Sequence, residues 1–202
     1  SKMASYNLTP TKHEWDFLVS EKCKDRLYIV GNTVLDNLVD ISPIDTPTVL
    51  ITMHRRENHS LMAEYFKTIE ELATENMDME FTFPMHPSPD VQKHRNIFKN
   101  VTVTEPLLYD DMIGVISSSR IIITDSGGIQ EEASFFKKKT IVCRKVTERF
   151  ASIGKSSVLC KEPSELKSVF NQAKENYIVT DECPFGDGHA SEKIVEILKC
   201  II

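Results

Sequence analysis

Short runs rich in β-branched residues alternate along this chain with segments whose apolar residues recur at helical spacing. Residues 61–75, for example, carry one apolar stripe made of Leu61, Tyr65, Ile69 and Leu72. This alternation predicts βαβ units and a mostly parallel sheet with helices on both faces. The predicted strands are 26–30, 48–53, 79–84, 100–104, 120–125, 139–143 and 156–160. The first helix is predicted to begin near Thr9-Pro10, and the others to cover 61–75, 88–97, 109–118, 128–137, 163–175 and 188–199.

The predicted strands are apolar on both sides, as are strands buried between two layers of helices. One Rossmann-like, doubly wound α/β domain accounts for nearly all of the chain, with a loop expected at 179–188. In such a sheet, ligands bind beyond the carboxyl ends of the strands. The strings HRREN, MHPSPD and SGGIQEE each follow a predicted strand, so they mark the expected binding edge.

The most specific local motif is IIITDSGGIQEEAS, residues 121–134, in which a buried strand leads through Ser126, Gly127 and Gly128 into a helix near Ile129. Two glycines let the backbone approach a ligand and adopt positive φ. The free N–H groups and the dipole of a helix start favour a phosphate. The alternative is an ordinary tight turn. A P-loop is excluded because the chain has no GxxxxGK[ST].

Glu131 and Glu132 follow one turn further into the same predicted helix. Carboxylates only accept hydrogen bonds, so both suit the vicinal hydroxyls of a ribose. The alternative is that both are solvated residues of a first helical turn.

The second motif is ITMHRRENHS, residues 51–60. His54 follows a predicted strand, where it could donate to a pyrophosphate or act near a reacting sugar. Arg55 and Arg56 could form charge-assisted hydrogen bonds to phosphate oxygens, and spacing does not decide which of them is structural. Alternatively, these side chains point into solvent and pair with Glu57.

Two further residues lie on the expected binding edge. His86 stands between prolines in FPMHPSPD, where a ligand-binding role and a packing role are both open. Arg149, in VTERF, could reach a phosphate or pair with Glu148 at the surface. No group of His, Cys and Asp residues has the spacing of metal ligands, so no metal is predicted.

Composition narrows the functional classes. The chain has 202 residues, 41% of them hydrophobic, so a single domain can bury a substantial core. A formal net charge of -6 argues against nucleic-acid binding, which needs a basic surface. The five scattered cysteines are typical of reduced thiols. We find no signal peptide and no apolar run of the roughly 20 residues needed to cross a bilayer. These features predict a cytoplasmic protein without membrane contact.

Together, the motifs resemble one family, the non-hydrolysing UDP-N-acetylglucosamine 2-epimerases, from about Tyr6 to Ile202. The matching strings, in the family's order, are GNTVLD, TMHRREN, HPSPDV, ITDSGGIQEEA, VTER, Gly154 and GDGHAS. The resemblance implies one half of a GT-B-type two-domain architecture and interconversion of UDP-GlcNAc and UDP-ManNAc by a homodimer. It also implies a route through removal of the C2 proton, elimination of UDP and readdition, with no cofactor.

The resemblance implies roles for individual residues. Ser126, Gly127 and Gly128 resemble the phosphate-binding turn, Glu132 the acid that holds the ribose, and His54 a histidine that influences catalysis. The remaining positions are Arg56 in the phosphate region, Arg149 on the VTER loop, His86 at an allosteric UDP-GlcNAc site, and Met112 where the family often stacks an aromatic ring on uracil.

The resemblance also implies how the chain is divided. Residues 1–202 correspond to the UDP-binding C-terminal domain, with 1–22 as a crossover segment from an absent N-terminal domain and 188–202 as a C-terminal helix. The absent domain supplies the family's main acid and base candidates, so this chain alone is expected to be inactive. The alternatives are a GT-B-type glycosyltransferase domain and a non-catalytic UDP-sugar-binding module.

Overall fold

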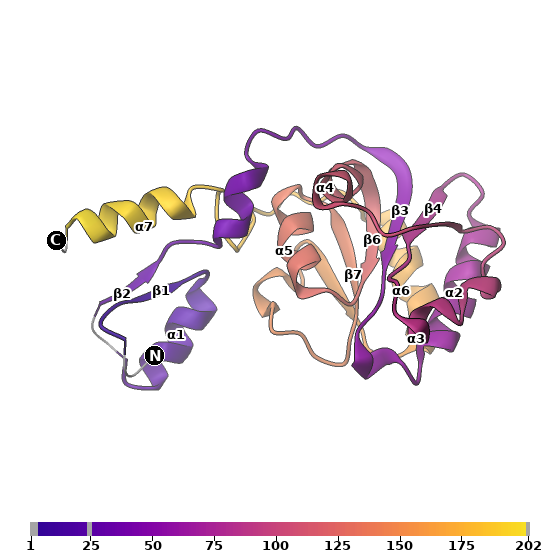
Figure 1. Cartoon of the computed structure of the whole chain (residues 1–202), viewed down its shortest axis with the longest axis horizontal. Helices are drawn as coiled ribbons and strands as arrows, with labels where there is room; N and C mark the ends of the chain where they lie inside the picture. Colours follow the sequence, from indigo (N-terminus) through magenta and orange to yellow (C-terminus); the bar gives the residue numbers. More distant parts are fainter. Residues whose placement is uncertain (1–3, 24–25, 201–202) are drawn as a thin grey trace.

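The computed structural model describes residues 4–23 and 26–200, and its centre is a six-stranded sheet in which all neighbouring strands are parallel (Figure 1). The spatial order is β5-β4-β3-β6-β7-β8. The strands are β3 (Thr46–Thr52), β4 (Glu80–Pro84), β5 (Thr102–Thr104), β6 (Ser119–Thr124), β7 (Lys139–Cys143) and β8 (Ser157–Cys160).

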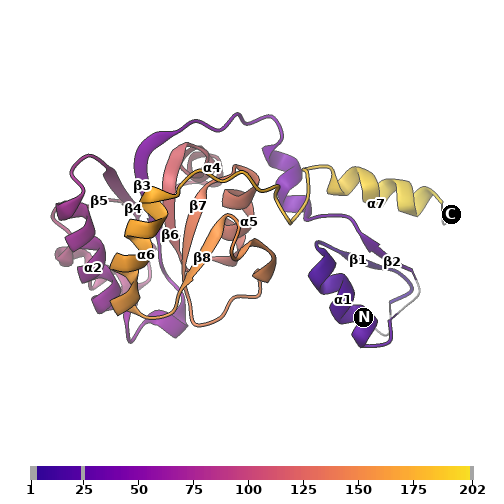
Figure 2. The ribbon, with the colours of Figure 1, turned by 180° about the vertical axis from the view of Figure 1, so that it is seen from behind.

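Helices cover both faces of this sheet, which confirms the predicted doubly wound α/β fold (Figures 1 and 2). The α-helices around the sheet are α2 (Met62–Glu75), α3 (Pro89–Gln92), α4 (Tyr109–Ser118), α5 (Gly127–Phe135) and α6 (Pro163–Glu175). The short 3-10 helices are η1 (Thr33–Leu38), η2 (Arg56–Asn58), η3 (Arg95–Ile97) and η4 (Phe150–Ser152).

Alternate residues of the two central strands, β3 and β6, belong to two separate cores. Val49 and Ile51 of β3 pack with α2 and α6 on one face, whereas Leu50 packs with η1, α4 and α5 on the other. Since side chains of a strand alternate between its faces, a sheet covered on both sides needs strands that are apolar throughout. The continuous apolar runs of the sequence have this physical cause.

The chain changes direction across the sheet between β3 and β6. From β3 it moves outward through β4 to β5, and then it returns to β6 and moves the other way through β7 to β8. Thr52 and Thr124 are register partners at the carboxyl ends of β3 and β6. Ligands of doubly wound sheets bind at such a switch point. The HRREN loop (54–58) after β3 and the Ser-Gly-Gly turn (126–128) after β6 therefore lie side by side.

Two expectations for the N-terminal part are wrong. The predicted strand 26–30 is β2 (Leu27–Ile29), which pairs in parallel with β1 (Asn7–Thr9) in a separate two-stranded sheet. The helix between them, α1 (Lys12–Ser20), does not begin at Thr9-Pro10. Thr9 is held in the β1 ladder, and the Thr11 side chain instead accepts the N–H of His13 as the helix cap.

The predicted helix 88–97 is divided into α3 and η3. The chain leaves the first helical turn at His94, whose ring packs edge-on against Phe66 of α2 with centroids 5.8 Å apart. Tertiary packing thus overrides a continuous helical pattern at this position.

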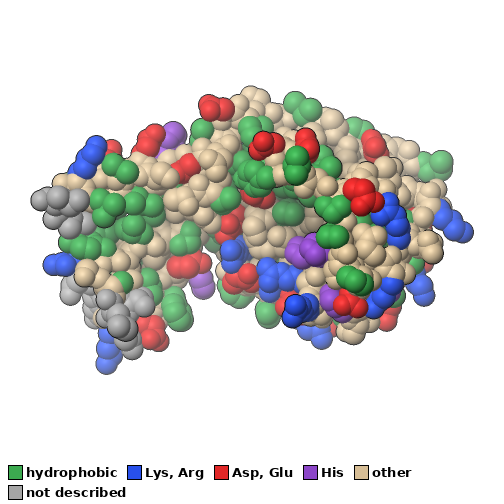
Figure 3. Space-filling view, viewed as in Figure 1, with side chains coloured by type: hydrophobic (Ala, Val, Ile, Leu, Met, Phe, Trp, Pro, Cys, Tyr) green, Lys and Arg blue, Asp and Glu red, His purple; other side chains and the backbone are tan. Residues whose placement is uncertain are grey.

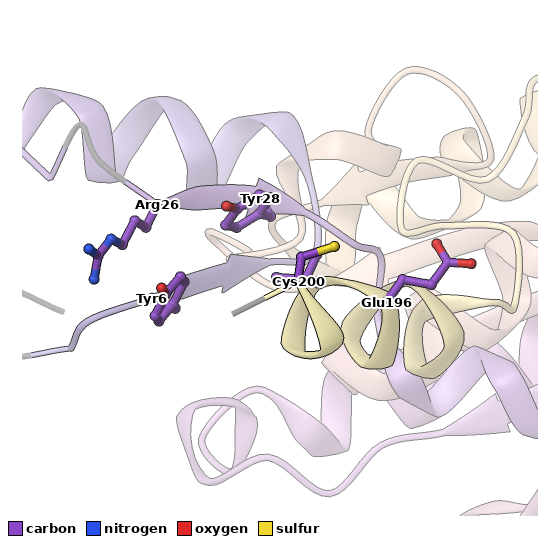
Figure 4. Close-up of a pocket in the computed structure, with 6 residues that line it drawn as sticks. Tyr6, Arg26, Tyr28, Glu196 and Cys200 are labelled. Carbon is purple, nitrogen blue, oxygen red and sulfur yellow. The ribbon is translucent and has the colours of Figure 1, made fainter. Parts of the chain in front are cut away.

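The predicted C-terminal helix is α7 (Ala190–Lys199), which extends from the large sheet beside the β1–β2 sheet (Figures 1 and 2). Asp36 of η1 caps it, accepting the backbone N–H of Ala190 at 2.9 Å and of Ser191 at 2.7 Å. A groove of about 480 Å³ separates α7 from the small sheet (Figure 4), lined by Tyr6, Arg26, Tyr28, Glu196, Ile197 and Cys200. Residues 1–3 and 201–202, at the ends of the predicted segments 1–22 and 188–202, lie outside the described residues.

Candidate functional site

Asp125 joins the two loops at the switch point. Its fully buried carboxylate accepts the backbone N–H groups of His54, at 3.1 Å to each oxygen, and of Arg55 at 2.9 Å. The Asn58 amide donates to it at 3.0 Å and also to the Cys143 carbonyl at 2.9 Å. These donors offset the large cost of burying a carboxylate. Asp125 therefore fixes the HRREN loop against the end of β6.

Asp125 and Asn58 are not among the site residues predicted from the sequence, where Asp125 marks only the end of a strand. The available signal was a carboxylate directly after an entirely apolar strand and before the Ser-Gly-Gly turn. A buried charge at such a position needs several donors, and the polar HRREN string was the nearest source of them.

The Ser-Gly-Gly turn is the start of α5. Ser126 is the cap residue and makes no side-chain capping bond, and the helix begins at Gly127 rather than near Ile129. The expectation of positive φ is wrong, because neither Gly127 nor Gly128 is among the positive-φ glycines. Since the first N–H groups of a helix have no partner inside it, this turn offers several donors to an anion, as predicted for a phosphate site.

The two glycines serve different purposes. A Cβ at Gly127 would come within 3.2 Å of a Glu148 carboxylate oxygen and 3.4 Å of the Arg149 guanidinium carbon, so glycine there admits the neighbouring VTER loop. A Cβ at Gly128 would meet nothing within 4 Å. Gly128 is exposed and faces open space at the helix start, where a ligand has room.

A buried pair of side chains also supports the turn. The Thr147 hydroxyl donates to the Gln130 side-chain oxygen at 3.0 Å, and the Gln130 amide donates to the Ser126 carbonyl at 3.2 Å. Gln130 and Thr147 are almost completely buried. The turn after β6 is thus linked to the loop after β7.

The structure separates Glu131 from Glu132. Glu131 accepts hydrogen bonds from the Asn32 amide and from Nε of Arg149, both at 2.7 Å. Glu132 interacts with the hydroxyl of Tyr109. A carboxylate has about four acceptor positions, so Glu132 has the greater unused capacity. This difference supports Glu132 as the residue for ribose hydroxyls.

Burial also controls the charge of Glu132. Removal from water raises its pKa to about 7, with a smaller contribution from neighbouring Glu131, although the Tyr109 hydrogen bond opposes the rise. Burial likewise raises the pKa of Glu131, against the attraction of Arg149. Glu132 therefore gains or loses its charge near neutral pH.

The arginines at the carboxyl ends of the strands differ in how many carboxylates they pair with. Buried Arg144 donates to Glu57 and Glu148, each at 2.6 Å, and Arg149 pairs with Glu131 at 2.7 Å and with Glu148 at 3.1 Å. The pairing of Arg149 with Glu148, one of the two alternatives for Arg149, is thus observed. Glu57 pairs with Arg144 and not with an arginine of its own loop.

Of the two arginines in the HRREN loop, Arg55 lies 3.9 Å from Glu148. Arg56 is exposed and forms no ion pair with the described residues, 4–23 and 26–200. A guanidinium without a carboxylate partner is the better placed of the two for a phosphate.

His54 and His86 come together although they follow different strands. Their rings are stacked, with centroids 5.1 Å apart and planes 12° from parallel. The His86 Nδ1 accepts the backbone N–H of Ser88 at 3.1 Å, so that ring is fixed by its own loop. Figure 3 shows histidine and basic side chains gathered on one face, beside the hollow between the two lobes.

Comparison with known proteins identifies the family. Residues 1–199 match the family model described as UDP-N-acetylglucosamine 2-epimerase. A curated protein of that name from Salmonella borreze is 32% identical over 97% of this chain and 61% of its own length. The chain belongs to the UDP-N-acetylglucosamine 2-epimerase family.

Solved structures of the family agree closely with this fold. The Neisseria meningitidis epimerase bound to UDP-GlcNAc gives a TM-score of 0.86 at 31% identity, over 98% of this chain and 62% of that one. The S. aureus MnaA complex with UDP gives a TM-score of 0.88 at 31% identity, over 98% and 60%. The predicted family and the prediction of one half of a GT-B-type fold are confirmed.

Two residues of α4 lie where the sequence predicts a contact with the base of the nucleotide. Met112 of α4 is partly buried and packs against the core formed with α5, while Tyr109, one turn earlier, is half exposed and hydrogen-bonded to Glu132. Tyr109 is therefore next to the proposed ribose residue. Stacking of uracil on either side chain stays a prediction.

No helix within residues 4–23 and 26–200 is long and apolar enough to cross a lipid bilayer. The chain spans 61% of the length of the Salmonella borreze relative.

Proposed function

We propose that the protein containing this chain is a UDP-N-acetylglucosamine 2-epimerase and that the chain is its UDP-binding half. The observation that carries the proposal is the α5 helix start, with an uncapped Ser126, open space at Gly128 and a Glu132 carboxylate with unused acceptor positions. A pyrophosphate at the N–H groups and a ribose at Glu132 would use these features together. Relatives whose structures contain UDP-GlcNAc or UDP support this ligand.

In this proposal, the remaining predicted residues contact other parts of the nucleotide sugar. Arg56 and Arg149 contribute positive charge for the phosphates, and Met112 lies beside Tyr109 near the base. His54 stands at the adjoining strand end for the reacting sugar, with His86 stacked on it as the candidate allosteric residue. Arg149 reaches a phosphate only by sharing its guanidinium with Glu131 and Glu148.

We further propose that the acid and base groups for the C2 proton come from an N-terminal domain. The support is the incomplete cover of the N-terminal part of this chain: α1 contains no buried residue, and the groove between α7 and the small sheet is open. Parallel strands are normally buried between other elements, so β1 and β2 suit a domain interface. In this proposal the 1–22 crossover extends through β2, and 188–202 returns as α7.

The proposed setting is cytoplasmic, with UDP-GlcNAc as ligand, a homodimeric whole protein and no nucleic-acid partner. The five scattered cysteines of the sequence, without a CxxC pair, are typical of reduced thiols. The acidic balance, with a net charge of -6, supports the expectation about nucleic acid.

A glycosyltransferase or a non-catalytic UDP-sugar-binding module could use the same nucleotide site. One experiment distinguishes both from an epimerase. The protein containing this chain is incubated with UDP-GlcNAc in D₂O, and the products are analysed by NMR. Epimerisation replaces the C2 proton with deuterium and yields UDP-ManNAc. A glycosyltransferase leaves the C2–H bond intact and releases UDP only with an acceptor. A UDP-sugar-binding module binds without either change, and that result would contradict the proposal.

A further inference from the structure

The Asp125 carboxylate has an acceptor position that the HRREN loop does not use. Its Oδ2 receives Arg55 N–H and the Asn58 amide, together with a share of the His54 backbone N–H. Its Oδ1 receives the His54 backbone N–H alone. A carboxylate oxygen has two lone pairs, so Oδ1 retains acceptor capacity inside a fully buried site.

The nearest ring nitrogen to that oxygen is Nδ1 of His54, at 3.6 Å. This separation is slightly beyond a hydrogen bond. The carboxylate is fully buried and the His54 side chain is 40% exposed, so the charge attracts the ring from inside the protein and solvent screens part of the attraction. An N–H directed at the carboxylate is attracted, whereas a nitrogen lone pair directed at it is repelled. The ring of His86 lies parallel to that of His54 and limits its rotation.

We infer that Asp125 is a positioning residue that selects the Nδ1–H tautomer of His54, so that the Nε2 lone pair is directed away from the buried carboxylate. This inference rests on the proposed function, since it gives His54 a chemical state at the proposed nucleotide edge. In this tautomer Nε2 carries no hydrogen, so that nitrogen cannot donate to a phosphate oxygen. Nε2 instead accepts a hydrogen bond or a proton from a hydroxyl or a water.

The electrostatic surroundings keep the ring neutral. Burial lowers the pKa of His54, and the neighbouring His86 and Arg55 lower it further, against the attraction of Asp125. The loop geometry depends on the backbone N–H groups and the Asn58 amide that donate to this carboxylate, whereas the tautomer depends on its charge. This separation makes a structural role and a positioning role distinguishable.

The test is a measurement of the ring-nitrogen resonances of the ¹⁵N-histidine-labelled chain, with His54→Gln assigning the signal. We expect a protonated Nδ1 and an unprotonated Nε2 for His54 in the unligated protein. In Asp125→Asn, the Nε2–H tautomer should gain population and the pKa of His54 should fall by about 1 unit or more, the usual effect of removing an opposite charge nearby.

Asn58→Ala is the matched control, because it removes a loop contact to the same carboxylate and leaves the charge facing the ring. It should lower stability without changing the tautomer. A dominant Nε2–H tautomer in the wild-type chain would overturn the inference, even if Asp125→Asn does not fold. An unchanged His54 signal in folded Asp125→Asn would also overturn it. Failure of the wild-type chain to bind UDP, with the Nδ1–H signal present, would count against the proposed function alone.

Discussion

At the scale of single residues, the protonation of Glu132 links stability to pH. Its pKa of about 7 in the folded chain compares with an ordinary value of 4.5, which corresponds to on the order of 3 kcal/mol at full ionisation. The folded state therefore holds an extra proton between these two pKa values. Stability is highest below the lower one and is lost as the pH rises through the higher one.

Glu132→Gln should remove this pH dependence, since its side chain is uncharged throughout. Urea unfolding at pH 5 and pH 8 measures the difference. We expect the wild-type chain to lose up to roughly 3 kcal/mol relative to the variant between these pH values. An equal pH dependence in both proteins would mean that Glu132 is ionised and solvated in the folded state.

At the scale of elements, the start of α5 can be tested with two neighbouring substitutions. Gly128→Ala places a methyl group in open space and favours the helix by roughly 0.5–1 kcal/mol, so stability should be kept or raised. The same methyl group occupies the proposed phosphate position, so UDP binding should weaken by about 10-fold or more, as after loss of a charged hydrogen bond.

Gly127→Ala is the companion variant, because its methyl group meets Glu148 and Arg149 instead. It should lower the melting temperature relative to Gly128→Ala. If Gly128→Ala bound UDP as tightly as the wild-type chain, the phosphates would have to lie elsewhere.

Asp36 of η1 caps the start of α7. Burial opposes ionisation of Asp36, but hydrogen bonds from Ser191 and Ala190 lower its pKa, so the cap is lost only as the pH falls below the ordinary range of an aspartate. Asp36→Ala should cost about 1 kcal/mol, as for other helix caps. Hydrogen exchange of the α7 amides should then accelerate by roughly fivefold. If the α7 amides of Asp36→Ala exchanged at the wild-type rate, other contacts would have to hold this helix.

The strands and helices of the large sheet could be predicted from sequence because burial on both faces leaves a direct apolar pattern. Residues 26–30 show the same pattern, yet they form the small sheet with β1, since periodicity does not specify a strand's partner. The motifs of the site were visible as unusual strings. Their hub, Asp125, was not, because its importance comes from donors that lie about 70 positions away in the sequence.

At the scale of the whole molecule, the proposal assigns the nucleotide site and the acid–base chemistry to different parts of the protein. The described chain contains the proposed nucleotide edge, and it spans 61% of the Salmonella borreze epimerase. We expect the 202-residue chain to bind UDP but to form no UDP-ManNAc from UDP-GlcNAc. Product analysis by NMR over hours checks this. Steady formation of UDP-ManNAc would show that the acid and base groups are in this chain.

The central claim, that this chain is the UDP-binding half of an epimerase, is tested most directly by calorimetric titration with UDP, using Glu132→Ala as the paired variant. A hydrogen bond to a charged group contributes roughly 1.5–3 kcal/mol. We therefore predict saturable binding to the wild-type chain and a loss of affinity of about 10- to 100-fold in the variant. Equal affinity in both, or no binding to the wild-type chain, would contradict the account.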